Sequence, residues 1–192
     1  MLTKFSKKVL FSLFPVISFV SAAASDPPAT ISVKGADAPV VSSSVIPLPM
    51  EEFSALDKLG NQDWNSQLDK RDFSPSADRS RSALLFGLAI ARGFVAVQAE
   101  NKEEVKKVGM AVQRLSGPLG VDRPVESRIK VIMESHDDVD WGGVKQEFDR
   151  TRQTVLKEMK TMRDDDLASL VALGGWLGGT DALSSILKDN YS

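Results

Sequence analysis

Cysteine is absent from this chain of 192 residues, and histidine occurs only once, as His136. Without cysteine there are no disulfide bonds, no thiol nucleophiles, no haem attached through cysteine and no lipid-bearing cysteine of the lipoprotein type. A Ser-His-Asp triad would have to use His136, and no serine lies in a Gly-x-Ser-x-Gly turn. Acidic residues are plentiful, so carboxylate-dependent hydrolysis is the catalytic alternative that stays open.

The single histidine is a poor basis for a metal site, because zinc sites use several histidine or cysteine ligands. The acids that follow His136 match a calcium-binding loop only in part, since Gly142 and Lys145 stand where that loop needs a ligand and an apolar residue. A helix N-cap at Asp140 explains the same acids. The methionines fall on apolar stripes, where core packing explains them better than haem ligation. We therefore predict no metal and no cofactor.

The N-terminus has the three-part layout of a secretory signal peptide. Three lysines precede an apolar run over residues 9–20, and small residues then offer a cleavage site after Ala24 or, one residue earlier, after Ala23. The apolar run contains Pro15 and is shorter than the roughly 20 residues of a membrane-spanning helix, which disfavours an uncleaved anchor. We predict that residues 1–24 are removed on export.

The predicted leader carries three of the 24 basic residues and none of the 26 acidic ones. The mature chain would therefore have 21 basic and 26 acidic residues, and a net charge of −5. An acidic protein is not expected to bind nucleic acid or anionic membranes nonspecifically. Export without disulfide bonds favours the bacterial periplasm, with an extracellular location as the alternative.

Residues 25–49 contain five prolines and a run of three serines. That density of prolines prevents a helix from propagating. We predict an extended or disordered arm over 25–49, which either lies loosely on the domain or tethers it to the envelope. A single helical domain is expected to follow over 50–192.

From Met50 onward, apolar residues recur at spacings of three and four, which is typical of helices. Ser74 and Pro75 predict the start of a helix over 75–98, in which Arg92 is the one charge within a long apolar stretch. A helix that is apolar on all sides belongs at the centre of a bundle. We predict an all-α bundle of five to six helices around this central helix.

The other predicted helices follow the same periodicity. Asn101 and Glu104 form a capping box that opens one of them. The expected segments are a short helix marked by Phe53, Leu56 and Leu59, one from 101 to a stop at Gly117-Pro118, one from about Pro124, a long one after Asp140, and a final segment in two parts over 165–178 and 180–189.

Four glycines within six residues surround a tryptophan in the last predicted segment. Each costs a helix about 1 kcal/mol relative to alanine, so the group needs a structural reason. Close approach of a neighbouring helix is the interpretation that we favour. The alternatives are a helix break capped by Thr180 or Asp181, and an anion-binding loop, although the lysine and the strand of a phosphate loop are missing. The expected packing residues are Gly174, Gly175, Trp176, Gly178 and Gly179.

Arg92 is the candidate ligand-binding residue. An unpaired buried charge is very costly, so its guanidinium must reach solvent or a carboxylate. The simpler interpretation is that Arg92 forms a structural ion pair. The functional interpretation is that it recognises an anion in a cleft between helices.

The sequence as a whole favours an exported, soluble protein with a noncatalytic binding or scaffolding role. It identifies no partner, although an envelope protein suits the predicted compartment. A carboxylate-dependent periplasmic hydrolase is the alternative, which a pair of acids across a cleft near Arg92 would favour. No membrane span is expected once the signal has been cleaved.

Overall fold

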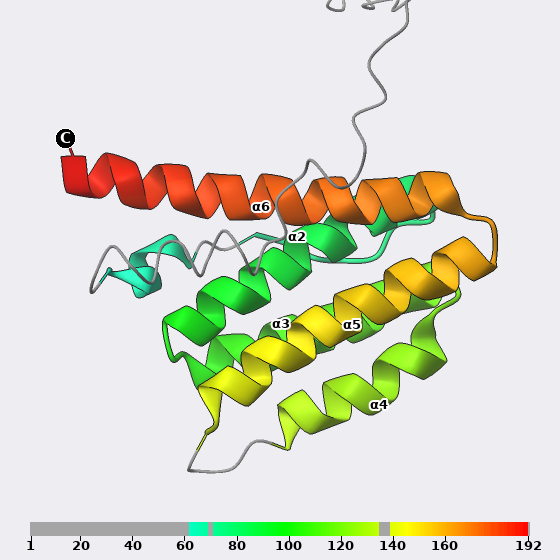
Figure 1. Ribbon diagram of the computed structural model, residues 1–192, viewed down its shortest axis with the longest axis horizontal. Coiled ribbons are helices and arrows are strands. Elements are labelled where there is room, and N and C mark those ends of the chain that lie inside the picture. Colours follow the sequence, from blue (N-terminus) through cyan, green and yellow to red (C-terminus); the bar gives the residue numbers. More distant parts are fainter. Residues whose placement is uncertain (1–61, 69–70, 135–138, 192) are drawn as a thin grey trace, which may run out of the picture. The chain divides into compact units, whose positions relative to one another are not determined.

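The computed structural model describes residues 62–68, 71–134 and 139–191, and all regular structure within these ranges is helical (Figure 1). Five α-helices follow a short 3₁₀ turn, which confirms the predicted all-α bundle. The elements are η2 (Trp64–Gln67), α2 (Arg79–Gln98), α3 (Lys102–Leu119), α4 (Asp122–Met133), α5 (Trp141–Thr161) and α6 (Asp165–Tyr191). The predicted signal peptide (1–24), the predicted arm (25–49), the predicted short helix at Phe53–Leu59 and His136 lie outside the described residues.

The central helix α2 begins at Arg79, four residues later than predicted. Asp78 is its N-cap, and the carboxylate accepts hydrogen bonds from the backbone N–H groups of Ser80 at 2.8 Å and Arg81 at 3.4 Å. The prediction of a start at Ser74 and Pro75 was wrong because a second capping residue lies four positions further along the chain.

The segment before α2 is fixed by local hydrogen bonds of its own. Ser74 donates its hydroxyl and its N–H to the carboxylate of Asp72, at 2.7 and 2.9 Å. The Ser82 hydroxyl of α2 accepts from the N–H of Ser76 at 3.1 Å and donates to the carbonyl of Ser76 at 3.0 Å. These bonds hold the chain against the first turn of α2 in a non-helical conformation.

Helix α3 continues through Pro118 to Leu119, so the predicted stop at Gly117-Pro118 came too early. A proline in the last turn removes only one hydrogen bond from the helix. Gly120 ends the helix with a φ of 73°, a left-handed conformation that glycine adopts without steric cost.

Helix α6 is continuous over its 27 residues, and the prediction of two separate parts was wrong. The cost of its glycines is offset by close packing on α2, described below. α2 lies at the centre, as predicted, in contact with α3, α5 and α6, while α4 packs on α3 and α5 (Figure 1). Phe94 of α2 and Phe148 of α5 meet in the core with ring centroids 6.4 Å apart.

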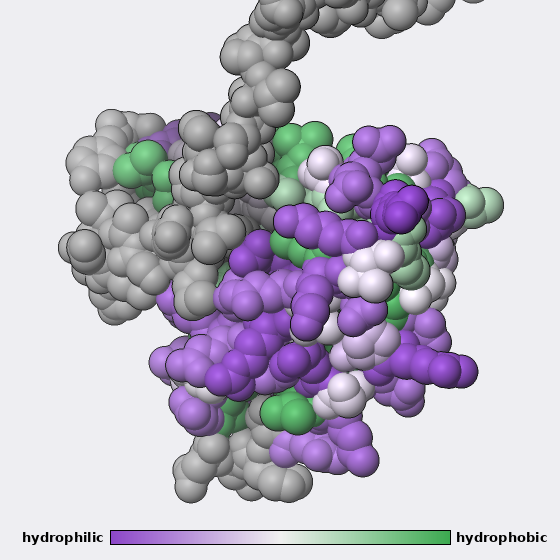
Figure 2. Space-filling view, turned by 45° about the vertical axis from the view of Figure 1, so that its right-hand side comes forward, coloured by the Kyte–Doolittle hydropathy of each residue, from purple (hydrophilic) through white to green (hydrophobic). Residues whose placement is uncertain are grey.

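Two helices in the described ranges are long and apolar enough to cross a membrane, judged by length and composition alone: α2 and residues Asp165–Asp189 of α6. The most apolar window of α2 is 72% buried within the bundle, whereas that of α6 is only 33% buried. α2 is therefore explained as a core helix, and α6 leaves apolar side chains at the surface. The described residues on the side of the molecule seen in Figure 2 are largely hydrophilic, with smaller apolar areas between them.

Candidate functional site

The guanidinium of Arg92 is enclosed within the bundle, with 8% of the residue exposed. Its Nε and Nη2 donate to Oε1 of Glu104 on α3, at 3.2 and 3.0 Å. Its Nη1 donates to the backbone carbonyl of Gln67 in η2, at 3.0 Å. The residue that the sequence singled out as a possible anion-binding group is thus engaged in an ion pair between α2 and α3.

Glu104 takes a different role from the one that the capping box assigns to it. Asn101 caps α3 as predicted, because its side chain accepts from the N–H of Glu104 at 3.0 Å. The return bond of a capping box is not made; the Asn101 N–H donates to the carbonyl of Ala96 instead. The Glu104 carboxylate is left for Arg92 and, at 3.5 Å, for the ammonium group of Lys107.

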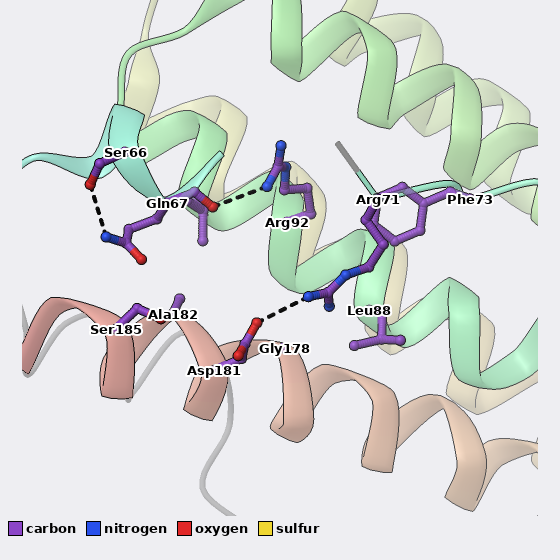
Figure 3. Close-up of a pocket in the computed structure, with 11 residues that line it drawn as sticks. Ser66, Gln67, Arg71, Phe73, Leu88, Arg92, Gly178, Asp181, Ala182 and Ser185 are labelled. Carbon is purple, nitrogen blue, oxygen red and sulfur yellow. Dashed lines mark hydrogen bonds and ion pairs between the residues drawn. The ribbon is translucent and has the colours of Figure 1, made fainter. Parts of the chain in front are cut away.

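A cavity of about 180 Å³ opens beside Arg92, between α2, α6 and the chain that leads into α2 (Figure 3). Arg71 and Asp181 join two of its walls through an ion pair of 3.0 Å, and both side chains are exposed to solvent. The described residues that line it are Ser66, Gln67, Arg71, Phe73, Leu88, Arg92, Val95, Gly178, Asp181, Ala182 and Ser185.

The lining of this cavity can bind through hydrogen bonds and charge, but it offers little for catalysis. Hydrolysis by paired carboxylates needs two of them facing the substrate, and Asp181 is the one acid among the described lining residues. Asp181 is also already paired with Arg71. The volume is below the roughly 300–1,000 Å³ of typical ligand pockets.

A second hollow, of about 340 Å³, lies between α3 and the chain around Arg71. Two acids, Asp72 and Glu104, contribute to its lining. Asp72 accepts two hydrogen bonds from Ser74, and Glu104 is bound by Arg92. Both carboxylates therefore hold the fold together, and neither faces the other as an unengaged acid or base.

Glycines bring α6 into close contact with α2. A Cβ atom added to Gly174 would lie 2.2 Å from the carbonyl oxygen of Leu84, and one added to Gly87 would lie 2.1 Å from that of Val171. These are contacts with backbone atoms, which cannot move aside without separating the helices. Gly174 and Gly87 thus form the point where α2 and α6 cross.

The other members of the glycine group take different places on α6. Gly178 faces α2, where an added Cβ would lie 2.6 Å from the Cβ of Ala91, and it also lines the cavity. Gly175 and Gly179 are buried, and Trp176 is half-buried. The described backbone forms no anion-binding loop here, because the whole stretch is helical.

Two sets of ion pairs that involve α5 were not predicted from the sequence. Glu147 accepts from Arg128 of α4 at 2.8 Å and from Arg150 at 3.3 Å. Asp149 and Arg152 form a buried ion pair of 2.9 Å within α5. A spacing of three residues between opposite charges was the available signal for the second pair. Both groups connect helices or complete the core, and neither lies in the cavity beside Arg92.

The side of α6 that faces away from α2 carries an apolar surface, which we call the α6 outer face. Three of its leucines are between 38% and 40% exposed. Between residues 168 and 187 the only charge on the helix is Asp181. The apolar members of the face are Leu173, Trp176, Leu177 and Leu187.

Within the described ranges no group of three or more histidine, cysteine or acidic side chains is placed to hold a metal ion. His136 lies outside these ranges. The features on which function can be argued are therefore the cavity beside Arg92 and the α6 outer face. No family model, no curated protein and no solved structure matches this chain.

Proposed function

We propose that this chain is an exported, periplasmic helical protein with a noncatalytic binding or scaffolding role, and that the α6 outer face is its binding surface. The observation that carries the proposal is the exposure of this face on a helix whose opposite side is tightly packed on α2. Exposed apolar patches on soluble proteins mark sites of interaction, because solvated leucines gain by being covered.

The chemistry of the face indicates the class of partner. A surface of leucine, tryptophan, threonine and serine with a single carboxylate suits another protein with an apolar, uncharged face. Nucleic acid and anionic lipid are disfavoured, because they require basic groups and the mature chain has a net charge of −5. In the periplasm the partner would be an envelope protein.

The carboxylate-dependent hydrolase has weaker support. The acids near Arg92 are held in ion pairs or hydrogen bonds, and one carboxylate lines the cavity. The arginines there bind carboxylates of the protein, which is a structural use of their charge.

Photo-crosslinking in cells that export the protein tests the binding role. A photo-reactive amino acid replaces Leu177 in one variant and a control residue in a second variant. Val131 on α4 is the matched control, because it is an apolar side chain with 59% exposure on another part of the surface. We expect irradiation to give a discrete adduct from position 177, in the periplasmic fraction, and none from position 131.

A variant lacking residues 2–24 should stay in the cytoplasm and lose that adduct. Absence of any adduct at position 177 in the exported protein would contradict the binding role, and normal export of the deletion variant would contradict the signal peptide.

A further inference from the structure

The hollow of about 340 Å³ between α3 and the chain around Arg71 has a charged rim and an apolar floor. Two buried residues of α3, Val108 and Ala111, contribute to the floor, and half-buried Phe73 contributes to it from the chain across the hollow. Positions on α3 three or four residues apart share one side of the helix, so that side forms one wall. We call this hollow the α3 groove; its α3 wall consists of Glu104, Lys107, Val108, Ala111 and Arg114.

Two cations of the rim carry charge that the bundle leaves largely unused. Arg114 is exposed and makes neither an ion pair nor a hydrogen bond with any residue that the structure describes. Lys107 is also exposed, and its contact with Glu104, at 3.5 Å, is longer than most hydrogen bonds. Seven residues separate the two cations, which places them on the same side of α3 about 10 Å apart, with Ala111 between them. Their long side chains can therefore reach one anion that lies over Ala111.

The acids of the α3 groove are occupied by donors of the protein itself. Asp72 accepts two hydrogen bonds from Ser74, and Oε1 of Glu104 is bound by Arg92. Among the described lining residues three cations stand against two acids. The groove thus has a local excess of positive charge on a chain that is acidic overall.

A carboxylate with an apolar body fits this combination. A guanidinium binds a carboxylate through two parallel hydrogen bonds, and an apolar body gains by covering the floor. A phosphate, with about two charges and three acceptor oxygens, needs more donors than Lys107 and Arg114 supply. The volume lies near the lower limit of ordinary ligand pockets, which is roughly 300 Å³, so the ligand is small.

We propose that the α3 groove binds a small organic carboxylate, with the carboxylate group between Lys107 and Arg114 and the apolar body on Phe73 and Ala111. The site is formed by α3 and the chain before α2, so it is separate from the α6 outer face. It adds a small-molecule ligand to the proposed protein-binding role and does not depend on that role.

Octanoate is the probe that tests this site, because its flexible chain can follow the apolar floor and it carries one carboxylate. Isothermal titration calorimetry of the full mature chain should give one site per molecule, with a dissociation constant below ~1 mM. Octanol has the same chain without the charge and should bind at least ~10-fold more weakly. Arg114→Gln should weaken the binding of octanoate by at least ~10-fold for the same reason.

Arg123→Gln is the matched control. Arg123, on α4, is also exposed, also makes no ion pair or hydrogen bond with the described residues, and does not line the α3 groove. Its substitution should change the affinity for octanoate by less than ~2-fold, because exposed charges outside a site are screened by salt. Circular dichroism establishes that both variants are folded.

Nuclear magnetic resonance locates the bound probe independently of any substitution. Octanoate should shift the backbone amide signals of Phe73 and Ala111 and leave those of Leu173 and Leu177 on the α6 outer face unchanged. Shifts centred on α6, equal affinity for octanol, or an unchanged affinity in Arg114→Gln would each overturn the proposal. Absence of both heat and shifts up to ~5 mM octanoate would also overturn it. Tighter binding of inorganic phosphate than of octanoate in the α3 groove would show that the assigned ligand class is wrong.

Discussion

Arg92 is tolerated within α2 because its donors meet acceptors from two other elements. Glu104 takes two of its N–H groups, and the carbonyl of Gln67 takes a third. The surroundings of Arg92 in the sequence predict that it needs such a partner. They do not predict which one, because Glu104 also fits a capping box and the Gln67 carbonyl has no sequence signature.

Glu104→Gln should destabilise the protein by about 2–3 kcal/mol, because it removes the charge of the carboxylate that accepts two hydrogen bonds from the buried guanidinium of Arg92. Urea denaturation followed by circular dichroism measures the loss. Glu103→Gln is the control, since Glu103 is exposed in the same turn and should change stability by less than ~0.5 kcal/mol.

Combining Glu104→Gln with Arg92→Met should recover part of that stability, since an apolar side chain of similar length carries no charge that needs a partner. Equal losses in the single and double variants would show that Arg92 contributes through packing rather than through its charge.

The crossing of α2 and α6 depends on two glycines that a sequence alone cannot pair. The spacing of apolar residues predicts each helix, since periodicity is a local property. Which glycine meets which is not local: Gly87 and Gly174 are brought together only by the fold. For the same reason the sequence suggests a break in α6, because the cost of glycine is visible in it and the compensating contact is not.

Gly174→Ala should destabilise the protein by about 2 kcal/mol or more. The added Cβ would meet the carbonyl oxygen of Leu84 at 2.2 Å, so the helices must separate and lose contacts that exceed the gain in helix propensity. Thermal and urea denaturation of the purified variants measure the effect.

Gly109→Ala is the matched control, because Gly109 is also a buried helical glycine, and a Cβ added there would make ordinary van der Waals contacts only, the nearest at 3.4 Å to Sδ of Met133. It should stabilise the protein by about 0.5–1 kcal/mol through helix propensity. If both substitutions shift stability in the same direction, the close crossing at Gly174 is not what holds α6 to α2.

In the molecule as a whole, the chain before α2 closes one side of the bundle through contacts distant in sequence. Gln67 donates to Asp189 at 3.2 Å, across 122 residues, and Arg71 pairs with Asp181 across 110. The sequence predicts the bundle and its central helix but not this closure, because the residues concerned lie outside any periodic pattern. The cavity beside Arg92 exists because of this closure, so among its described lining residues the sequence indicated a ligand-binding role for Arg92 only, and Gly178 was expected to serve helix packing.

Two truncated chains test how much this closure contributes. A chain of residues 62–192 keeps buried Trp64, the Gln67 carbonyl that binds Arg92, and Arg71. A chain of residues 76–192 loses all three, and exposes the apolar surface that Trp64 and Phe73 cover. Removing a buried tryptophan alone costs about 3–5 kcal/mol, so the shorter chain should be less stable by at least ~3 kcal/mol.

Urea denaturation of both chains, with Trp64→Ala in the longer one as an intermediate reference, measures the difference. Equal stability of the two chains would mean that helices α2 to α6 account for the free energy of unfolding by themselves. The segment before α2 would then contribute nothing to stability.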